Sequence, residues 1–314
     1  MIELSGIYKR YGNIQALKDL SMVVRPGRAL GLLGKNGAGK STVMNILVGC
    51  LCQDAGTVKI DGVDMRKDPL KAKRAFGYLP ENAPVYPEMT IREYLLFAAR
   101  LNRVAANRQK DAVDAAMERL QLAELANRLT GALSKGQRQR VGLAQALFCT
   151  DARILVLDEP TSGLDPSQIA QFREMIKRMR GEYTILLSSH ILADVRDVCD
   201  EIAVIDSGSM IVQGEMDALI DRYAAYTTLE LVVEKDCAAL LERLRGHGAV
   251  RSALPVGRTA EPYAKLCVQS DRDIRSDVFR AAVETGTVLL SMTAPESTLD
   301  NIFARITGSG REGT

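Results

Sequence analysis

The chain has 314 residues, enough for one large domain or two smaller ones, and its 46% hydrophobic and 25% charged residues are ordinary for a soluble globular protein. A net charge of +2 argues against a strongly basic nucleic-acid surface and against an acidic tail, so no nucleic-acid partner is expected. No apolar run approaches the roughly 20 residues that cross a bilayer, and residues 1–11 lack the apolar core of a signal peptide. We therefore expect the protein to stay where it is made.

Two strands are predicted at the start of the chain, at residues 2–8 and 20–24. The polar stretch between them contains Tyr11. An aromatic side chain ahead of a phosphate-binding loop is able to stack on a nucleotide base. The alternative is a half-buried surface tyrosine, and the spacing alone does not decide between the two.

The next stretch has the pattern G-x-x-x-x-G-K-[ST] of a phosphate-binding loop. An apolar run at 29–33 predicts a buried strand before it, and the apolar residues between 41 and 49 predict a buried helix after it. Glycines let the main chain approach a ligand, and their amides with the helix N-terminus form a nest for a polyphosphate. Lys40 brings a positive charge to the outer phosphates, and Ser41 a hydroxyl for Mg²⁺. The predicted site consists of Gly34, Lys35, Asn36, Gly37, Ala38, Gly39, Lys40, Ser41 and Thr42.

A helical block interrupts this strand-rich pattern. A predicted hairpin at 56–65 and a short strand at 76–79 lead into a proline-rich loop that begins with Glu81. Thr90 and Glu93 form a capping box for the first helix of the block. Helices are predicted at residues 91–101, about 107–120 and 137–148. The block, at about residues 85–150, indicates an inserted helical subdomain.

The stretch 133–137, Leu-Ser-Lys-Gly-Gln, precedes the third helix of this block. Ser134, Gly136 and the exposed helix start form a candidate second anion site. The alternative is a plain N-cap. If the helix belongs to a separate subdomain, this site cannot easily serve the same phosphates as Lys40.

Two adjacent carboxylates end an apolar strand predicted at 154–157. Buried carboxylates are costly unless a cation or proton chemistry uses them. Successive residues of an extended chain point to opposite sides, so one can face Mg²⁺ and the other a water molecule. His190 lies just past another apolar strand, predicted at 184–188, and ligands gather at the carboxyl ends of strands in a doubly wound sheet. The side chains expected on that edge are Lys40, Asp158, Glu159 and His190.

The pattern of predicted strands and helices changes after about residue 222. A helix starting at Asp165-Pro166, a hairpin at 202–205 and 210–212, and a helix from 216 to about 223 complete a first domain at 1–222. A small α+β domain is predicted at about 225–308, with βαββαβ as one arrangement. Its strands are predicted at 228–233, 263–268 and 288–292, and its helices at 237–244, 274–283 and 299–306. Residues 309–314 are predicted to be a disordered tail.

All six cysteines lie in apolar surroundings, and we interpret them as reduced core thiols. One C-x-C pair with no partner histidine is weak evidence for a metal site. His247, between two glycines, is expected in a loop. The cysteines are Cys50, Cys52, Cys149, Cys199, Cys237 and Cys267.

In their order along the chain, these motifs resemble those of the nucleotide-binding subunit of an ATP-binding cassette (ABC) transporter, over about residues 1–222. The resemblance implies an α/β P-loop NTPase core, with a RecA-like parallel sheet and an N-terminal antiparallel β subdomain. The C-terminal extension more weakly resembles that of bacterial exporter-type (ABC-2-like) cassettes. Residues 34–42 resemble the Walker A loop, 133–137 the signature sequence, 154–159 Walker B with its catalytic glutamate, 162–165 the D-loop, and His190 the switch histidine.

The resemblance also implies what each site residue does. Tyr11 stacks on the adenine of ATP, and Lys40 holds the phosphates. Glu159 polarises the attacking water and His190 contacts the γ-phosphate. Asp158 holds Mg²⁺ through water.

Three residues depart from the family pattern. Glu81 stands where Gln usually reaches Mg²⁺ and water, Lys35 where Pro is common, and Lys135 where Gly is commoner. Lys35 should matter little, because its backbone does the binding. We expect this branch to tolerate Glu81 as a ligand of the Mg²⁺ site, the alternative being a retuned ATP hydrolysis.

ABC cassettes dimerise head to tail, so the resemblance implies that Ser134, Gly136 and Gln137 bind the γ-phosphate held by the Lys40 of a second copy. A chain with motor motifs and no membrane span implies a separate permease, docked near the proline-rich loop. The expected location is cytoplasmic, peripheral on the inner face of the cell membrane, and export is favoured over import.

Two other functions remain as alternatives at this stage. A soluble cassette ATPase acting on ribosomes or nucleic acid usually has two cassettes or a long coiled coil, and this chain has one Walker A motif and no sustained heptads. A GTPase-like switch would carry an Asn-Lys-x-Asp motif, which does not occur in the sequence.

Overall fold

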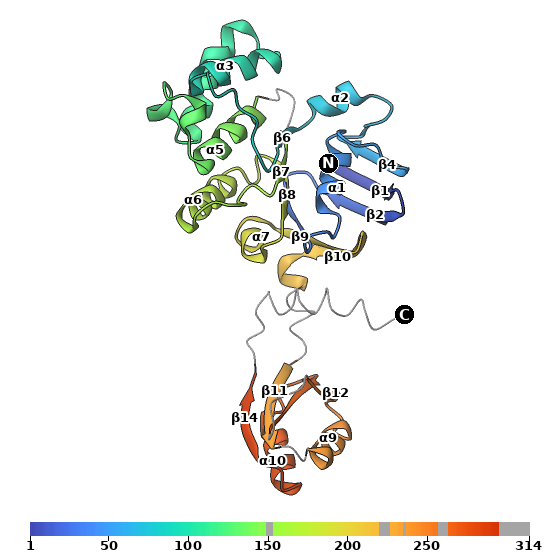
Figure 1. The fold of residues 1–314 in the computed structure, drawn as a ribbon. Coiled ribbons are helices and arrows are strands. Elements are labelled where there is room, and N and C mark those ends of the chain that lie inside the picture. The colour runs from blue at the N-terminus through green and yellow to red at the C-terminus, as the bar shows by residue number, and fades with distance from the viewer. Residues whose placement is uncertain (149–152, 220–226, 235–236, 257–262, 295–314) are drawn as a thin grey trace. The chain divides into compact units, whose positions relative to one another are not determined.

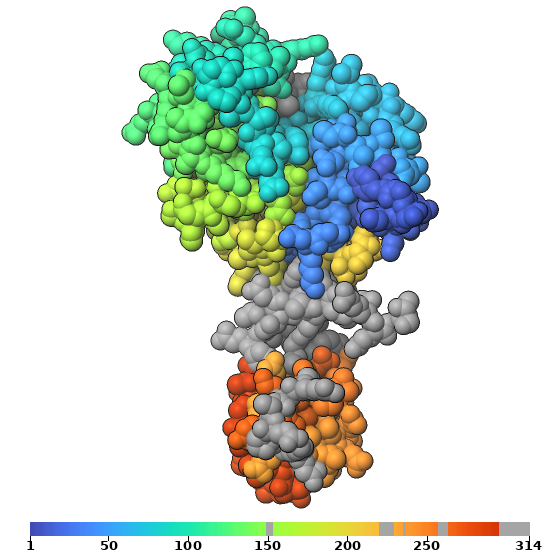
Figure 2. All heavy atoms as spheres, viewed as in Figure 1, coloured from blue at the N-terminus to red at the C-terminus, as the bar shows by residue number. Residues whose placement is uncertain are grey.

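The computed structural model describes residues 1–148, 153–219, 227–234, 237–256 and 263–294. The chain folds as two compact units that are divided after Met216 (Figure 1). In the first unit, the helical subdomain and the N-terminal sheet form different sides of the molecular surface, green and blue in Figure 2. No helix among the described residues is long and apolar enough to span a bilayer.

A six-stranded sheet in the order β10-β9-β3-β8-β7-β6 forms the centre of the first unit. All neighbouring strands are parallel except β10, which pairs antiparallel with β9. Every residue of β3, β7 and β8 is buried, as expected for parallel strands with both faces covered. The bounds are β3 Ala29–Leu33, β6 Gly77–Leu79, β7 Ile154–Asp158, β8 Thr184–Ser189, β9 Glu201–Asp206 and β10 Ser209–Glu215.

A second sheet, antiparallel and in the order β2-β1-β4-β5, is built from the first 64 residues. The helix after the glycine-rich loop, α1, packs in one apolar core with both sheets, through Met44 together with Leu4 and Val156. The core therefore connects the loop to both sheets of the first unit. The bounds are β1 Ile2–Tyr11, β2 Ile14–Val24, α1 Lys40–Leu47, β4 Ala55–Ile60 and β5 Val63–Asp64.

The helical subdomain is inserted between β6 and β7 (Figure 1). Its first helix has the predicted capping box, with Thr90 accepting from the Glu93 amide and Glu93 accepting from the Thr90 amide. A second capping box joins Ser134 and Gln137, so α5 begins two residues earlier than predicted. The bounds are α3 Ile91–Leu101, η1 Ala106–Arg108, α4 Gln109–Arg119, η2 Ala123–Leu125, η3 Thr130–Ala132 and α5 Lys135–Ala146.

Three further helices lie in the first unit. Asp165 caps α6 by accepting from the Gln168 amide, with Pro166 as the first helical residue, as predicted. The sequence patterns did not indicate α2 or α7, which have only six and seven residues. The bounds are α2 Pro69–Arg74, α6 Pro166–Lys177 and α7 Leu192–Val198.

The second unit has the βαββαβ order β11-α9-β12-β13-α10-β14, folded as an antiparallel sheet in the order β12-β13-β11-β14. Its own apolar core includes Leu231, Leu240, Val268 and Val278. The sequence patterns gave no range for β12, and the helix predicted at 299–306 and the tail at 309–314 lie outside the described residues. The bounds are β11 Thr227–Glu234, α9 Ala238–Arg245, β12 Val250–Pro255, β13 Tyr263–Ser270, α10 Arg275–Glu284 and β14 Leu289–Thr293.

The interpretation of the cysteines as core residues is wrong for two of them. Cys50 and Cys52 are exposed, because they lie in the turn between α1 and β4, whereas Cys199 is buried. Cys237 and Cys267 are half-buried, and Cys149 lies outside the described residues. Short apolar neighbours in sequence do not guarantee burial when the chain is turning between elements.

Candidate nucleotide-binding site

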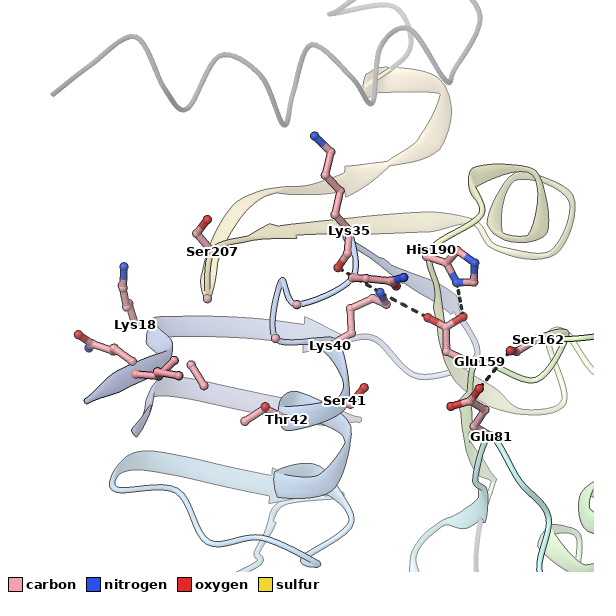
Figure 3. A pocket seen from close by; sticks show the side chains of 17 residues that line it. Lys18, Lys35, Lys40, Ser41, Thr42, Glu81, Glu159, Ser162, His190 and Ser207 are labelled. Carbon is pink, nitrogen blue, oxygen red and sulfur yellow. Dashed lines mark hydrogen bonds and ion pairs between the residues drawn. The ribbon is translucent and has the colours of Figure 1, made fainter. Parts of the chain in front are cut away.

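A cavity of 540 Å³ opens where the glycine-rich loop leaves the parallel sheet (Figure 3). Most of the predicted loop lines it, together with Glu81, Glu159 and His190 from three other segments. Gly34, Ala38 and Asp158 do not line it directly. The loop residues that line it are Lys35, Asn36, Gly37, Gly39, Lys40, Ser41 and Thr42.

The loop conformation requires glycine at two positions that the sequence pattern specifies. Gly39, the N-cap of α1, has φ 109°, and an added Cβ there would lie 2.9 Å from a methyl carbon of Leu17. At Gly34 an added Cβ would lie 2.7 Å from the carbonyl oxygen of Ile205. The main chain therefore passes where no side chain fits, which leaves its amides free to approach a ligand.

Lys40 is folded back over this loop. Its side chain is 6% exposed, and Nζ donates to the carbonyl oxygen of Gly34 at 2.8 Å and to that of Lys35 at 3.4 Å. The Lys35 side chain instead extends away from the loop (Figure 3). Lys40 thus holds its positive charge at the loop, where the outer phosphates of a nucleotide are expected.

The Glu159 carboxylate joins two of the predicted side chains. Its Oε1 lies 3.4 Å from Lys40 Nζ, and its Oε2 lies 2.7 Å from His190 Nδ1 (Figure 3). Glu159 has φ 43°, a left-handed backbone conformation that is uncommon for a residue with a side chain. This turn directly after β7 places the carboxylate between the loop lysine and the histidine that follows β8.

The side chain of Asp158, the last residue of β7, is held by a hydrogen bond from Ser188. Ser188 Oγ donates to Asp158 Oδ1 at 2.6 Å and accepts from the backbone N–H of Glu159 at 2.9 Å. Burial raises the pKa of Asp158, the nearby charges of Glu159 and Glu81 add to this, and the Ser188 hydrogen bond opposes it. One buried hydroxyl therefore orients both carboxylate residues, a role that no sequence pattern indicated for Ser188.

The oxygen donors at this end of the cavity suit a small divalent cation. The Ser41 hydroxyl and the carboxylates of Asp158 and Glu81 are the ligand type that Mg²⁺ prefers. Among the described residues no lysine or arginine lies within ion-pairing distance of the buried Asp158, whose negative charge is therefore available to a cation. In the described part of the chain, no group of three or more His, Cys, Asp or Glu side chains is placed to hold a metal ion.

Glu81, one of the three residues that depart from the family pattern, is bonded through both its side chain and its backbone. Its Oε1 accepts from Ser162 Oγ at 3.1 Å (Figure 3). Its backbone carbonyl accepts from Gln139 Nε2 at 2.5 Å. Gln139 belongs to α5, so Glu81 connects the cavity to the helical subdomain.

The structure does not bring four of the predicted residues to this cavity. Tyr11 lies at the end of β1 with 47% of its surface exposed, and Lys9 Nζ lies 5.8 Å from the centre of its ring. Ser134, Gly136 and Gln137 lie at the start of α5, outside the set of lining residues. Ser134 is the N-cap of α5 and is also exposed. The structure is therefore compatible with both interpretations of this helix start, a plain N-cap and a second anion site.

Several lining residues were missed by reasoning from the sequence. All but Ser162, which lies after β7, come from the start of β2 and from the β9–β10 turn. These two segments meet where the Lys18 amide donates to the Gly208 carbonyl at 2.8 Å. The hairpin turn at 207–208 was predicted, but no local signal indicated that it lies against β2, 190 residues earlier. The missed lining residues are Ile14, Gln15, Ala16, Lys18, Ser162, Ser207 and Gly208.

A buried strand, a glycine-rich loop, a helix with its lysine, and carboxylates at the end of a neighbouring parallel strand define a P-loop nucleoside triphosphatase. The family model described as "ABC transporter" matches residues 17–162. The chain is 33% identical over 315 residues to the Nod factor export ATP-binding protein I of Bradyrhizobium sp. (strain SNU001), an alignment that covers 99% of this chain and 97% of the relative. It is 31% identical over 316 residues to the daunorubicin resistance ATP-binding protein DrrA3 of Streptomyces coeruleorubidus, covering 99% and 96%.

Among solved structures, a dimeric bacterial ABC transporter cassette is 25% identical, with a TM-score of 0.61 over 69% of this chain and 99% of that chain. The chain therefore belongs to the ABC transporter family. It is an ATP-binding and ATP-hydrolysing subunit that energises transport, as the motifs predicted. The alternatives of a ribosome- or nucleic-acid-directed cassette and of a GTPase-like switch are not favoured.

Proposed function

We propose that ATP binds in the 540 Å³ cavity with its phosphates on the glycine-rich loop and its γ-phosphate between Lys40 and His190. Glu159 polarises the attacking water, and Tyr11 stacks on the adenine. Ser41, Asp158 and Glu81 would hold Mg²⁺, Asp158 through water, and the ion would neutralise phosphate charge. The observation that supports these roles is the Glu159 carboxylate, which contacts both Lys40 and His190 at the loop.

The cavity of one chain is incomplete, and a second copy completes it. Ser134, Gly136 and Gln137 lie outside the cavity that contains Lys40. In a head-to-tail dimer they reach the γ-phosphate bound by the partner copy, and each copy does the same for the other. The likeness to a dimeric ABC cassette supports this arrangement.

The transport step takes place in a separate integral membrane permease. The chain is peripheral on the cytoplasmic face of the membrane, and the proline-rich loop after Glu81 contacts the permease. The relatives named for Nod factor export and daunorubicin resistance support export as the direction. Since Glu81 is bonded to both Ser162 and Gln139, a movement of this loop changes the ATP site and the helical subdomain together.

A mixing experiment tests the shared site. Lys40→Ala removes the lysine that contacts the phosphates in a chain's own site. Ser134→Arg blocks the helix start with which a chain completes the site of its partner copy. Each variant alone is expected to be inactive, whereas a 1:1 mixture regains about a quarter of wild-type ATPase activity, because half of the pairs are mixed and each mixed pair has one intact site. A mixture that stays inactive, or a monomer that hydrolyses ATP at the full rate, would overturn the proposal.

A further inference from the structure

A buried carboxylate that no step of the proposed hydrolysis uses lies beneath the site. Asp194, on α7, is 1% exposed. Charged groups are rarely buried so completely unless they are paired and hydrogen-bonded. The contacts of Asp194 therefore indicate what it holds in place.

Asp194 contacts three segments: the turn after β7, the end of β8 and helix α6. Its Oδ2 accepts from Thr161 Oγ1 and lies 3.4 Å from Ser189 Oγ, and its Oδ1 accepts from Arg173 Nε at 3.1 Å. Thr161 and Ser189 are themselves buried. The guanidinium of Arg173, on α6, balances the buried charge and uses a second nitrogen, Nη1, to bond the exposed Asp197 at 3.0 Å.

Two of these partners adjoin the catalytic side chains. Thr161 follows Glu159 by two residues, in a tight turn where the Ser162 amide donates to the Glu159 carbonyl at 3.0 Å. Ser189 directly precedes His190. Its Oγ accepts from the Ile191 amide at 3.0 Å and lies 3.2 Å from the Ile191 carbonyl oxygen and 3.4 Å from Asp194 Oδ2, so its one proton is shared between these two acceptors. The Asp194 carboxylate thus contacts both turns. The side chains that these turns carry, Glu159 and His190, meet in a contact of 2.7 Å.

We propose that Asp194 is a positioning residue for ATP hydrolysis: through Thr161 and Ser189 it fixes the Glu159 turn and the His190 turn relative to each other. The Thr161 turn is held from two sides, because the next residue, Ser162, donates to Glu81 at 3.1 Å. Asp194 therefore holds this turn on one side, and Glu81 holds it on the other. The inference rests on the ATP hydrolysis described above and adds a residue that touches neither ATP nor water.

The Thr161 hydroxyl allows a test that changes little else. Thr161→Val keeps the shape of the side chain and removes the donor to Asp194, whereas Thr161→Ser keeps the donor. We expect Thr161→Val in the full chain to lower kcat for ATP about tenfold, since small misplacements of catalytic groups cost that much or more. KM for ATP should change less than twofold, because the loop that binds the phosphates is unaltered, and Thr161→Ser should stay within about twofold of wild type.

Asp197→Asn is the matched control, because it removes an exposed ion pair from the same Arg173 and leaves Asp194 with its partners. Thermal unfolding of each variant shows whether the fold is retained, and Asp194→Asn should reproduce the loss of kcat. A Thr161→Val chain with wild-type kcat, a Thr161→Ser or Asp197→Asn chain as slow as Thr161→Val, or a loss confined to KM would each overturn the inference. An inactive wild-type chain would overturn the proposed function as well, whereas an active wild type with an equally active Thr161→Val overturns the inference alone.

Discussion

His190 Nδ1 lies 2.7 Å from Glu159 Oε2, while the other oxygen of the same carboxylate lies 3.4 Å from Lys40 Nζ. The three side chains come from the ends of β7 and β8 and from the start of α1. Lys40 and Glu159 partly neutralise each other's charge. In the reaction that we propose, the γ-phosphate competes with Glu159 for Lys40, which leaves the carboxylate to the attacking water and to His190.

Replacing Glu159 with Gln should stop turnover and preserve ATP binding. The amide keeps the shape of the side chain and cannot take a proton from water, so kcat should fall by about 10²–10⁴-fold. ATP-dependent dimers should accumulate, which size-exclusion chromatography with ATP and Mg²⁺ would detect. Glu174→Gln, on the exposed face of α6, is the control and should hydrolyse ATP normally. Normal turnover by Glu159→Gln would contradict the role given to Glu159.

Removing the Ser188 hydroxyl should disturb the placement of the two carboxylates in the site. Ser188→Ala takes away the donor to Asp158 and the acceptor for the Glu159 amide, so both carboxylates lose their fixed positions. Groups of this kind around metal sites are typically worth about 10–100-fold in metal affinity or activity, and we expect a loss of that size in kcat or in the Mg²⁺ concentration that gives half-maximal rate. Ser5→Ala, at an exposed position of β1, should leave both unchanged. Unaltered Mg²⁺ dependence together with unaltered kcat would show that Ser188 is dispensable.

The acid side of the pH–rate profile should respond to Glu81. Burial raises the pKa of Asp158, and the negative charge of Glu81 raises it further. Asp158 must be ionised to hold Mg²⁺, so activity is lost as the pH falls through this raised pKa. Glu81→Gln removes one neighbouring negative charge, which lowers the pKa of Asp158 and moves the loss of activity to lower pH. The measurement is kcat/KM against pH at a fixed, subsaturating Mg²⁺ concentration, with the exposed Glu88→Gln as control. A shift to higher pH would have the wrong sign for this explanation.

Gly77, the first residue of β6, should be sensitive to substitution. An added Cβ would lie 2.0 Å from the Ala146 carbonyl oxygen and 2.7 Å from its carbon, at the end of α5. Since both groups are backbone, relief requires β6 and α5 to move apart, and overpacking of this kind typically costs about 1–3 kcal/mol or more. Gly77→Ala should lower the midpoint of thermal unfolding, whereas Gly248→Ala, with no atom within 4 Å of its added Cβ, should not. Equal midpoints for the two variants would refute this account of the packing.

Local patterns in the sequence predicted the elements whose stability depends on near neighbours. The strand, loop and helix around Lys40, the capping box at Thr90 and the Asp165 cap each involve residues within a few positions of one another, and all are present. The order of motifs along the chain was also sufficient to predict an α/β core with an inserted helical block. The short helices α2 and α7 escaped prediction because six or seven residues carry too little periodicity.

The amino-acid pattern was thus enough to predict the phosphate loop, the paired carboxylates and the family of ATP-hydrolysing subunits. Three contacts became known from the folded chain alone: Ser188 donates to Asp158, Thr161 donates to Asp194, and the turn at Gly208 lies against β2. Hydrogen bonds between residues 30 or more positions apart leave no periodic pattern along the chain, because either partner taken alone reads as an ordinary polar residue. The folded sheets bring such partners within hydrogen-bonding distance. Because these polar groups are then buried, each of them needs a hydrogen-bond partner.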